Sequence, residues 1–171
     1  ITPRPRTPGG PKGNAFKSSM VVTIYRGGFG MSMSELLERL EAAGIILDDL
    51  TKSAMIDIKP GDFTDYDLEG FWHDRPVPFL FTGFGATRTI SAPHMIATLL
   101  YHLEVIVGQD IILVGSKGGY LAAIIDRMVG EDGSVTIIEP NEEVRLHTED
   151  RLSSHRCSGE IKVIRPNDVD E

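Results

Sequence analysis

Residues 110–120 read Asp-Ile-Ile-Leu-Val-Gly-Ser-Lys-Gly-Gly-Tyr, an apolar run followed at once by a glycine-rich turn. A run this short, bounded by turn residues, predicts a strand that is buried on both faces of a parallel sheet. The turn leads into a helical pattern over 120–129. Strand, turn and helix in this order form the first half of a strand–helix–strand unit.

The same alternation continues towards the C-terminus. The pattern predicts a second strand over 134–139, a helix over 141–152 and a third strand over 160–165. Strands that alternate with helices pair in parallel through right-handed crossovers. The predicted fold class is therefore α/β and Rossmann-like.

The chain before the first predicted strand is expected to be mainly helical. Leucine spacing and capping residues predict helices over 34–44 and 48–58. Residues 59–90 are rich in glycine, proline and aromatic side chains, so we expect a long irregular connection that binds or covers something. A third helix is predicted after Ser91, its expected N-cap, with core side chains Met95, Ile96, Leu99, Leu100 and Leu103.

The composition indicates which class of protein this is. The chain has 171 residues, of which 41% are hydrophobic and 25% charged, which fits one folded, soluble domain. No apolar run reaches the roughly 20 residues that a membrane-spanning helix needs. The single cysteine, Cys157, cannot form an internal disulfide, and no Cys/His cluster has the spacing of a zinc site. A reducing, cytoplasmic setting without a bound metal is expected.

Charge divides the chain into two parts. Residues 1–30 carry five basic residues and no acid, which predicts a flexible basic arm or a segment left over from expression. The other 141 residues carry 12 basic and 25 acidic residues, a formal balance of −13. Such an acidic body is a poor match for the phosphate backbone of nucleic acid.

The glycine-rich turn is the first candidate site. Glycines let a ligand approach the backbone closely, and the helix that follows offers free N–H groups. Glu139 ends the second strand, 20 residues after Gly119, where an acid commonly accepts the ribose hydroxyls of a nucleotide-type cofactor. The glycines do not fit G-x-G-x-x-G, which disfavours NAD. The alternative interpretation is a tight turn with a surface glutamate.

The second candidate site is Thr-Ile-Ser-Ala-Pro-His-Met over 89–95. The hydroxyl of Ser91 and the N-terminus of the helix behind it could hold a carboxylate. The alternative is a plain N-cap, with His94 an ordinary first-turn histidine. The sequence has no G-x-S-x-G motif and no pattern of a nucleophilic triad.

Residues 85–95 resemble the T-I-S-A-P-H-M signature of the protein-L-isoaspartate O-methyltransferase family. Its context agrees, since 34–46 and 73–79 resemble the family's opening helix and its Y-x-D-x-P-L-P-I segment. Residues 113–120 stand where the family carries its S-adenosylmethionine glycine motif, and 130–139 match the segment that follows. The resemblance runs in order over most of the chain.

The resemblance implies a Rossmann-like class I methyltransferase fold with N-terminal helices. It also implies methyl transfer from S-adenosylmethionine to the free carboxylate of isoaspartyl residues in damaged proteins, which would be the partners of this chain. Ser91 would hold that carboxylate, with Thr89 and His94 shaping the pocket. The cofactor would be bound by Gly115, Ser116, Gly118, Gly119 and Glu139.

Three positions depart from the family pattern. Lys117 replaces the middle glycine of the cofactor turn, where its charge would repel the methionine cation. Leu113 replaces the acid that opens the motif, and Arg88 replaces a Gln or Ala. The alternative function is therefore a non-catalytic, methyltransferase-like interaction or assembly module that has lost cofactor binding.

The sequence ends at Glu171, soon after the third predicted strand, whereas the family's sheet continues with further strands. We therefore expect 31–171 to form an incomplete methyltransferase-like α/β domain with its C-terminal strands missing. Its first strand would be a long apolar edge, which a stable monomer avoids. A homo-oligomer or a separate C-terminal half would cover that edge.

Overall fold

A computed structural model describes residues 30–155 and 157–168. Nearly all of the predicted basic arm, 1–30, lies outside the described residues. The fold described below belongs to the compact unit Met31–Glu171. In the described part of this unit, no helix has the length and apolar character needed to cross a membrane.

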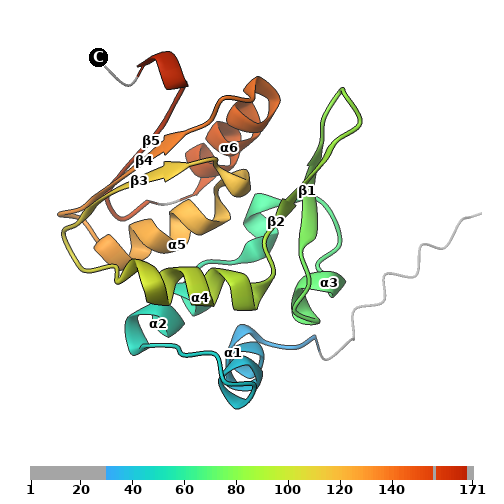
Figure 1. Cartoon of the computed structure of the whole chain (residues 1–171), viewed down its shortest axis with the longest axis vertical. Helices are drawn as coiled ribbons and strands as arrows, with labels where there is room; N and C mark the ends of the chain where they lie inside the picture. The colour runs from blue at the N-terminus through green and yellow to red at the C-terminus, as the bar shows by residue number, and fades with distance from the viewer. Residues whose placement is uncertain (1–29, 156, 169–171) are drawn as a thin grey trace, which may run out of the picture. The chain divides into compact units, whose positions relative to one another are not determined.

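A parallel sheet of three strands forms one layer of the unit (Figure 1). The strands are β3 (Asp110–Val114), β4 (Ser134–Ile138) and β5 (Glu160–Ile164), in the order β3-β4-β5. Ser134 of β4 pairs with Asp110 on one side and with Glu160 on the other. This sheet confirms the predicted α/β class.

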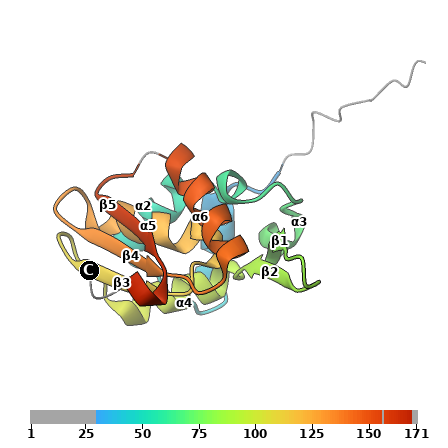
Figure 2. The ribbon, with the colours of Figure 1, turned by 90° about the horizontal axis from the view of Figure 1, so that it is seen from above.

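Two helices connect the strands and lie on one side of the sheet (Figure 2). Helix α5 (Tyr120–Val129) has the predicted bounds. Helix α6 (Glu142–Ser154) begins one residue later than predicted and ends two residues later. Successive right-handed crossovers in one direction place both helices on the same face. The Asn141 side chain caps α6 by accepting the Val144 N–H at 3.0 Å.

The prediction that the first strand is buried on both faces is wrong. Ile111 of β3 is 6% exposed, but Ile112 is 67% and Val114 is 82% exposed. Both crossover helices cover one face, and nothing in the described residues covers the other. Strand β3 lies at the edge of the sheet, as predicted.

The N-terminal helices agree with the sequence. Helix α1 (Met33–Ala42) has a capping box between Ser32 and Glu35, and α2 (Asp49–Asp57) is capped by Asp48. Helix α2 packs against α5. Both helices therefore add buried apolar side chains to the core: Leu36, Leu37, Leu40, Ala54 and Met55.

The long irregular connection predicted over 59–90 is in fact largely ordered. It contains the 3₁₀ turn η1 (Pro60–Phe63), the short helix α3 (Glu69–Trp72) and an antiparallel hairpin. The hairpin consists of β1 (Val77–Phe81) and β2 (Thr87–Ile90). Its aromatic side chains differ in burial, because Phe79 is buried in the core whereas Phe81 and Phe84 are exposed.

Helix α4 (Pro93–Leu103) differs from its prediction in two respects. Its N-cap is Ala92 rather than Ser91, and no side chain of the N-cap residue bonds to the first turn. Of the expected core side chains, Ile96 and Leu100 are buried, whereas the following are 37–55% exposed: Met95, Leu99 and Leu103. The part of this helix surface away from the core is thus open.

Candidate functional site

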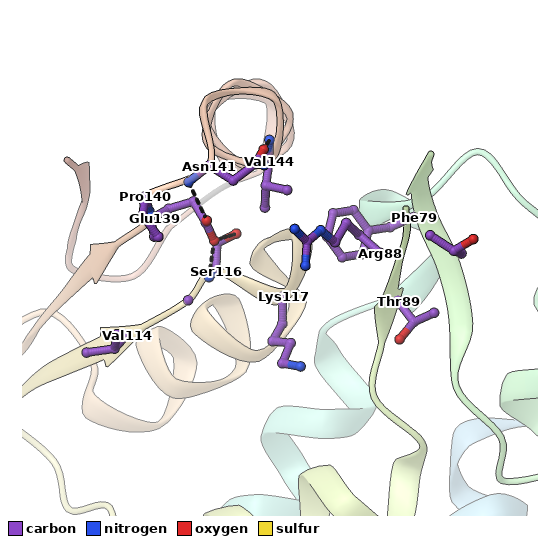
Figure 3. A pocket seen from close by; sticks show the side chains of 12 residues that line it. Phe79, Arg88, Thr89, Val114, Ser116, Lys117, Glu139, Pro140, Asn141 and Val144 are labelled. Carbon is purple, nitrogen blue, oxygen red and sulfur yellow. Dashed lines mark hydrogen bonds between the residues drawn. The ribbon is translucent and has the colours of Figure 1, made fainter. Parts of the chain in front are cut away.

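A cavity of about 370 Å³ lies at the carboxyl ends of β3 and β4 (Figure 3). Ligands of open parallel sheets bind at this end of the strands. The turn after β3, the start of α6 and the hairpin β1–β2 form its walls. The side chains and backbone that line it are Phe79, Thr87, Arg88, Thr89, Val114, Gly115, Ser116, Lys117, Glu139, Pro140, Asn141 and Val144.

The turn after β3 has an unusual backbone. Gly115, Lys117, Gly118 and Gly119 all have φ between +48° and +91°. A Cβ atom on Gly118 would lie 2.9 Å from the ring of Phe79, whereas a Cβ on Gly115 would meet nothing within 4 Å. Gly118 is therefore required for packing, while Gly115 leaves open space on the cavity side.

Glu139 joins the ends of β3 and β4. Its Oε2 accepts the backbone N–H of Ser116 at 2.9 Å and the Ser116 hydroxyl at 3.1 Å, and its Oε1 accepts the Asn141 N–H at 2.9 Å. A carboxylate has about four acceptor positions, so one position on Oε1 remains. The Ser116 hydroxyl in turn accepts a hydrogen bond from Thr148 at 2.8 Å.

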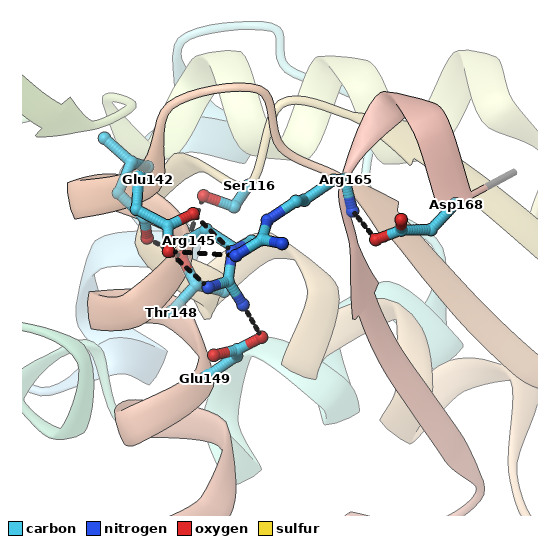
Figure 4. Close-up of polar contacts among 8 residues, drawn as sticks. Ser116, Glu142, Arg145, Thr148, Glu149, Arg165 and Asp168 are labelled. Atoms are coloured by element: carbon cyan, nitrogen blue, oxygen red, sulfur yellow. Dashed lines mark hydrogen bonds and ion pairs between the residues drawn. The ribbon is translucent and has the colours of Figure 1, made fainter.

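The start of α6 is held by a charged network (Figure 4). Arg145 bonds to Glu142 at 2.8 Å and also pairs with Glu149, and Arg165, directly after β5, reaches Glu142 at 3.2 Å. Hydrogen bonds from Arg145 and then Arg165 lower the pKa of Glu142 to about 2. The network links β5 to α6 and so fixes the wall that carries Asn141.

Two cations line the cavity. Lys117 and Arg88 are both exposed, and within 30–155 and 157–168 neither forms an ion pair. Arg88 extends towards Ser116, and Lys117 points away from Glu139, with its nitrogen at about the level of Thr89 (Figure 3). Two cations and one carboxylate, Glu139, therefore line the cavity, and the formal charge of its side chains is positive.

A smaller cavity of about 100 Å³ adjoins the start of α4. Ser91 lines it, and Lys117 lines both this cavity and the larger one. The other residues around it are mainly apolar: Ile90, Met95, Ile96, Leu99, Tyr120 and Leu121. Lys117 therefore stands between the two candidate sites that the sequence predicts.

His94 lines neither cavity. Its backbone N–H donates to Oδ1 of Asp74 at 2.9 Å, and its Nδ1 lies 2.9 Å from Oδ2 of the same carboxylate. Asp74 thus lies at the N-terminus of α4, where negative charge is favoured. This contact joins residues 20 positions apart, and no local pattern indicates it.

The structure brings four of the predicted site residues to the larger cavity: Thr89, Gly115, Ser116 and Glu139. Gly118 and Gly119 belong to the same turn but do not line the cavity. Gly118 faces Phe79, and Gly119 faces Phe63, Leu152 and Thr148. The sequence does not indicate Phe79 or Asn141 as lining residues. No group of three or more metal-binding side chains occurs in the part of the chain that the structure describes.

Comparison with known proteins identifies the family. A sequence model of protein-L-isoaspartate(D-aspartate) O-methyltransferase matches residues 31–167. The chain belongs to this family. It is 30% identical over 137 residues to protein-L-isoaspartate O-methyltransferase from Methanopyrus kandleri, with 80% of this chain and 58% of the relative covered. The enzyme of the same name from Ignicoccus hospitalis is 33% identical over 121 residues, covering 70% of this chain and 55% of that relative.

A solved protein-L-isoaspartate O-methyltransferase has the same fold. It aligns with a TM-score of 0.64 at 22% sequence identity, covering 78% of this chain and 41% of that chain. This likeness confirms the predicted class I methyltransferase architecture. The chain spans a little over half the length of the two curated relatives named above.

Proposed function

We propose that this chain binds S-adenosylmethionine in the larger cavity and directs its methyl group to an isoaspartyl carboxylate of a damaged protein. One observation carries the proposal: Gly115 and Glu139 of the cofactor motif and Thr89 of the Thr-Ile-Ser-Ala-Pro-His-Met signature line a single cavity. A methyl transfer requires donor and acceptor to share one space. When bound, the cofactor supplies an electrophilic methyl group on a sulfonium sulfur.

The volume, Gly115 and Glu139 are compatible with this cofactor, whereas the ammonium of Lys117 would repel its sulfonium. The volume of about 370 Å³ falls in the range of small-molecule sites. Gly115 leaves room for a ligand against the backbone, and Oε1 of Glu139 has one acceptor position for a ribose hydroxyl. A second ribose hydroxyl would be accepted only if the Ser116 hydroxyl turned away from Oε2.

The chain's own residues would act by binding and by excluding water. An isoaspartyl carboxylate is ionised at pH 7, so no side chain has to remove a proton. Thr89 and Ser91 would bind the substrate from the hairpin and the start of α4. Phe79, which is 3% exposed, would keep water from the wall opposite Glu139.

Isothermal titration of the purified chain with S-adenosylmethionine and S-adenosylhomocysteine tests the proposal. We expect micromolar binding of at least one of them, weakened about tenfold by Glu139→Gln through the lost charge-assisted hydrogen bond. Glu131→Gln, in the exposed turn before β4, is the matched control. A methylation assay with an isoaspartyl peptide follows.

Circular dichroism melting of each variant separates lost binding from lost folding. If a folded chain bound neither ligand, the proposal would fail. The alternative, a family member that acts as an interaction or assembly module, would then be favoured. The binding partners would next be sought among proteins rather than small molecules.

A further inference from the structure

The first turn of α4 offers no free backbone N–H to a substrate carboxylate. Pro93 lacks an N–H, His94 donates its N–H to Asp74, and Met95 donates its N–H to the carbonyl of Ala92 at 3.0 Å. The Asp74 carboxylate also places a negative charge there, which would repel a second carboxylate. A substrate anion must therefore find its positive partner elsewhere in the site.

Lys117 is placed to be that partner. It lines both the cavity with Glu139 and the cavity with Ser91, and it forms no ion pair within the described residues. In Figure 3 its ammonium points away from Glu139 and lies at about the level of Thr89. An anion held there would lie at the junction of the two cavities.

The backbone at this position argues against a purely structural lysine. Lys117 has φ +48°, a left-handed conformation that glycine adopts more easily than any residue with a Cβ. It is followed by two glycines that also have positive φ. Glycine would make the same turn with less strain, so the side chain itself must account for a lysine here.

We propose that Lys117 binds the carboxylate of the isoaspartyl substrate through its ammonium group. This inference rests on the proposed function. In the transfer, a carboxylate oxygen forms the new O–CH₃ bond as the S–CH₃ bond breaks, with the electron pair going to sulfur and no proton moving. The ester product is neutral and no longer attracts Lys117, so the same residue favours release of the product.

The test uses fluorescence anisotropy of two labelled peptides that differ at one position. One carries isoaspartate and the other carries isoasparagine, its neutral carboxamide analogue. We expect the full chain to bind the isoaspartyl peptide about tenfold more tightly, a preference that weakens as salt is raised. Lys117→Met should reduce the preference to about twofold or less, and Lys117→Arg should retain most of it.

The control is Lys59→Met, since Lys59 is an exposed lysine beside η1 that lines neither cavity. It should leave the preference unchanged. Titration with S-adenosylmethionine in the same samples separates the possible failures. If the cofactor bound and the two peptides bound equally, or if Lys117→Met kept the preference, this inference alone would be overturned. If a folded chain bound neither cofactor nor peptide, the proposed function would be overturned with it.

Discussion

Asp74 caps helix α4 through His94, with one carboxylate oxygen on the backbone N–H and the other 2.9 Å from Nδ1. Asp74→Ala should lower the free energy of unfolding by about 1–2 kcal/mol, because the cap and its charge are both lost. Asp74→Asn keeps an acceptor oxygen and tolerates the φ of +58°, so its loss should be less than half as large. Urea denaturation of both variants measures the difference, and equal losses would show that the acceptor does not matter.

Gly118 and Gly115 form a matched pair for testing the turn. Both have positive φ, but only at Gly118 would a new Cβ collide with Phe79. Gly118→Ala should lower the free energy of unfolding by about 2–4 kcal/mol, and Gly115→Ala by about 1 kcal/mol from backbone strain alone. Thermal melting compares the two. Similar losses would mean that the hairpin shifts freely away from the turn.

We expect the free energy of unfolding to depend on pH because His147 is partly buried. It is half-buried on α6, its Nε2 lies 3.2 Å from the carbonyl oxygen of Phe63, and burial lowers its pKa below the ordinary 6.5. The unfolded chain then binds a proton at higher pH than the folded chain does. The stabilisation is therefore complete above about pH 6.5 and is lost as the pH falls through the lowered pKa.

Chemical denaturation at several pH values between 7.5 and about 5 measures this dependence. His147→Gln should flatten the curve over that range. His102→Gln, at an exposed position on α4, serves as the control and should leave the slope as it is. If the free energy of unfolding of His147→Gln depended on pH as strongly as that of the wild type, other titrating groups would be responsible.

The open edge of β3 predicts self-association. Ile112 and Val114 are exposed on a strand whose outer hydrogen-bonding groups have no neighbouring strand within the described residues. Ile112→Lys should reduce the mean particle mass in light scattering at micromolar concentration, with little change in the midpoint of unfolding. A wild-type chain that is monomeric at that concentration would contradict the prediction.

Local pattern was sufficient to predict most helices and the parallel strands. Helix α5 has the predicted bounds because glycines stand directly before and after an apolar run with helical spacing. Strand β4 ends one residue before its predicted end, and β5 likewise. The signals in these segments are turn residues and periodicity, which depend only on neighbours in the chain.

The hairpin and the covering of the sheet depend on tertiary contacts. Pro78 lies within β1, and the register shifts between Pro78 and Leu80, so the alternation that indicates a strand is broken. The apolar residues of β3 have the same pattern whether one face or both faces are covered. Exposure of Ile112 therefore cannot be predicted from its own segment.

The candidate site was predictable only in its motifs. The sequence predicts Gly115 and Glu139 as site residues because each stands at the end of a predicted strand. It predicts Thr89 because this residue belongs to the Thr-Ile-Ser-Ala-Pro-His-Met signature. That Lys117 borders both cavities, and that Asp74 occupies the start of α4, results from how the hairpin packs against the turn. Contacts between residues so far apart in the sequence cannot be predicted from local periodicity.

The hairpin gives the larger cavity one entire wall, through Phe79 and Thr87–Thr89, and Gly83 in its turn donates its N–H to Glu143 of α6 at 2.8 Å. A ligand that needs this wall binds only while the hairpin is docked. By mass action such a ligand raises the free energy of hairpin opening in proportion to the logarithm of its concentration above Kd. Amide hydrogen exchange in β1 and β2 would then slow as the cavity fills, even at backbone groups that no ligand touches.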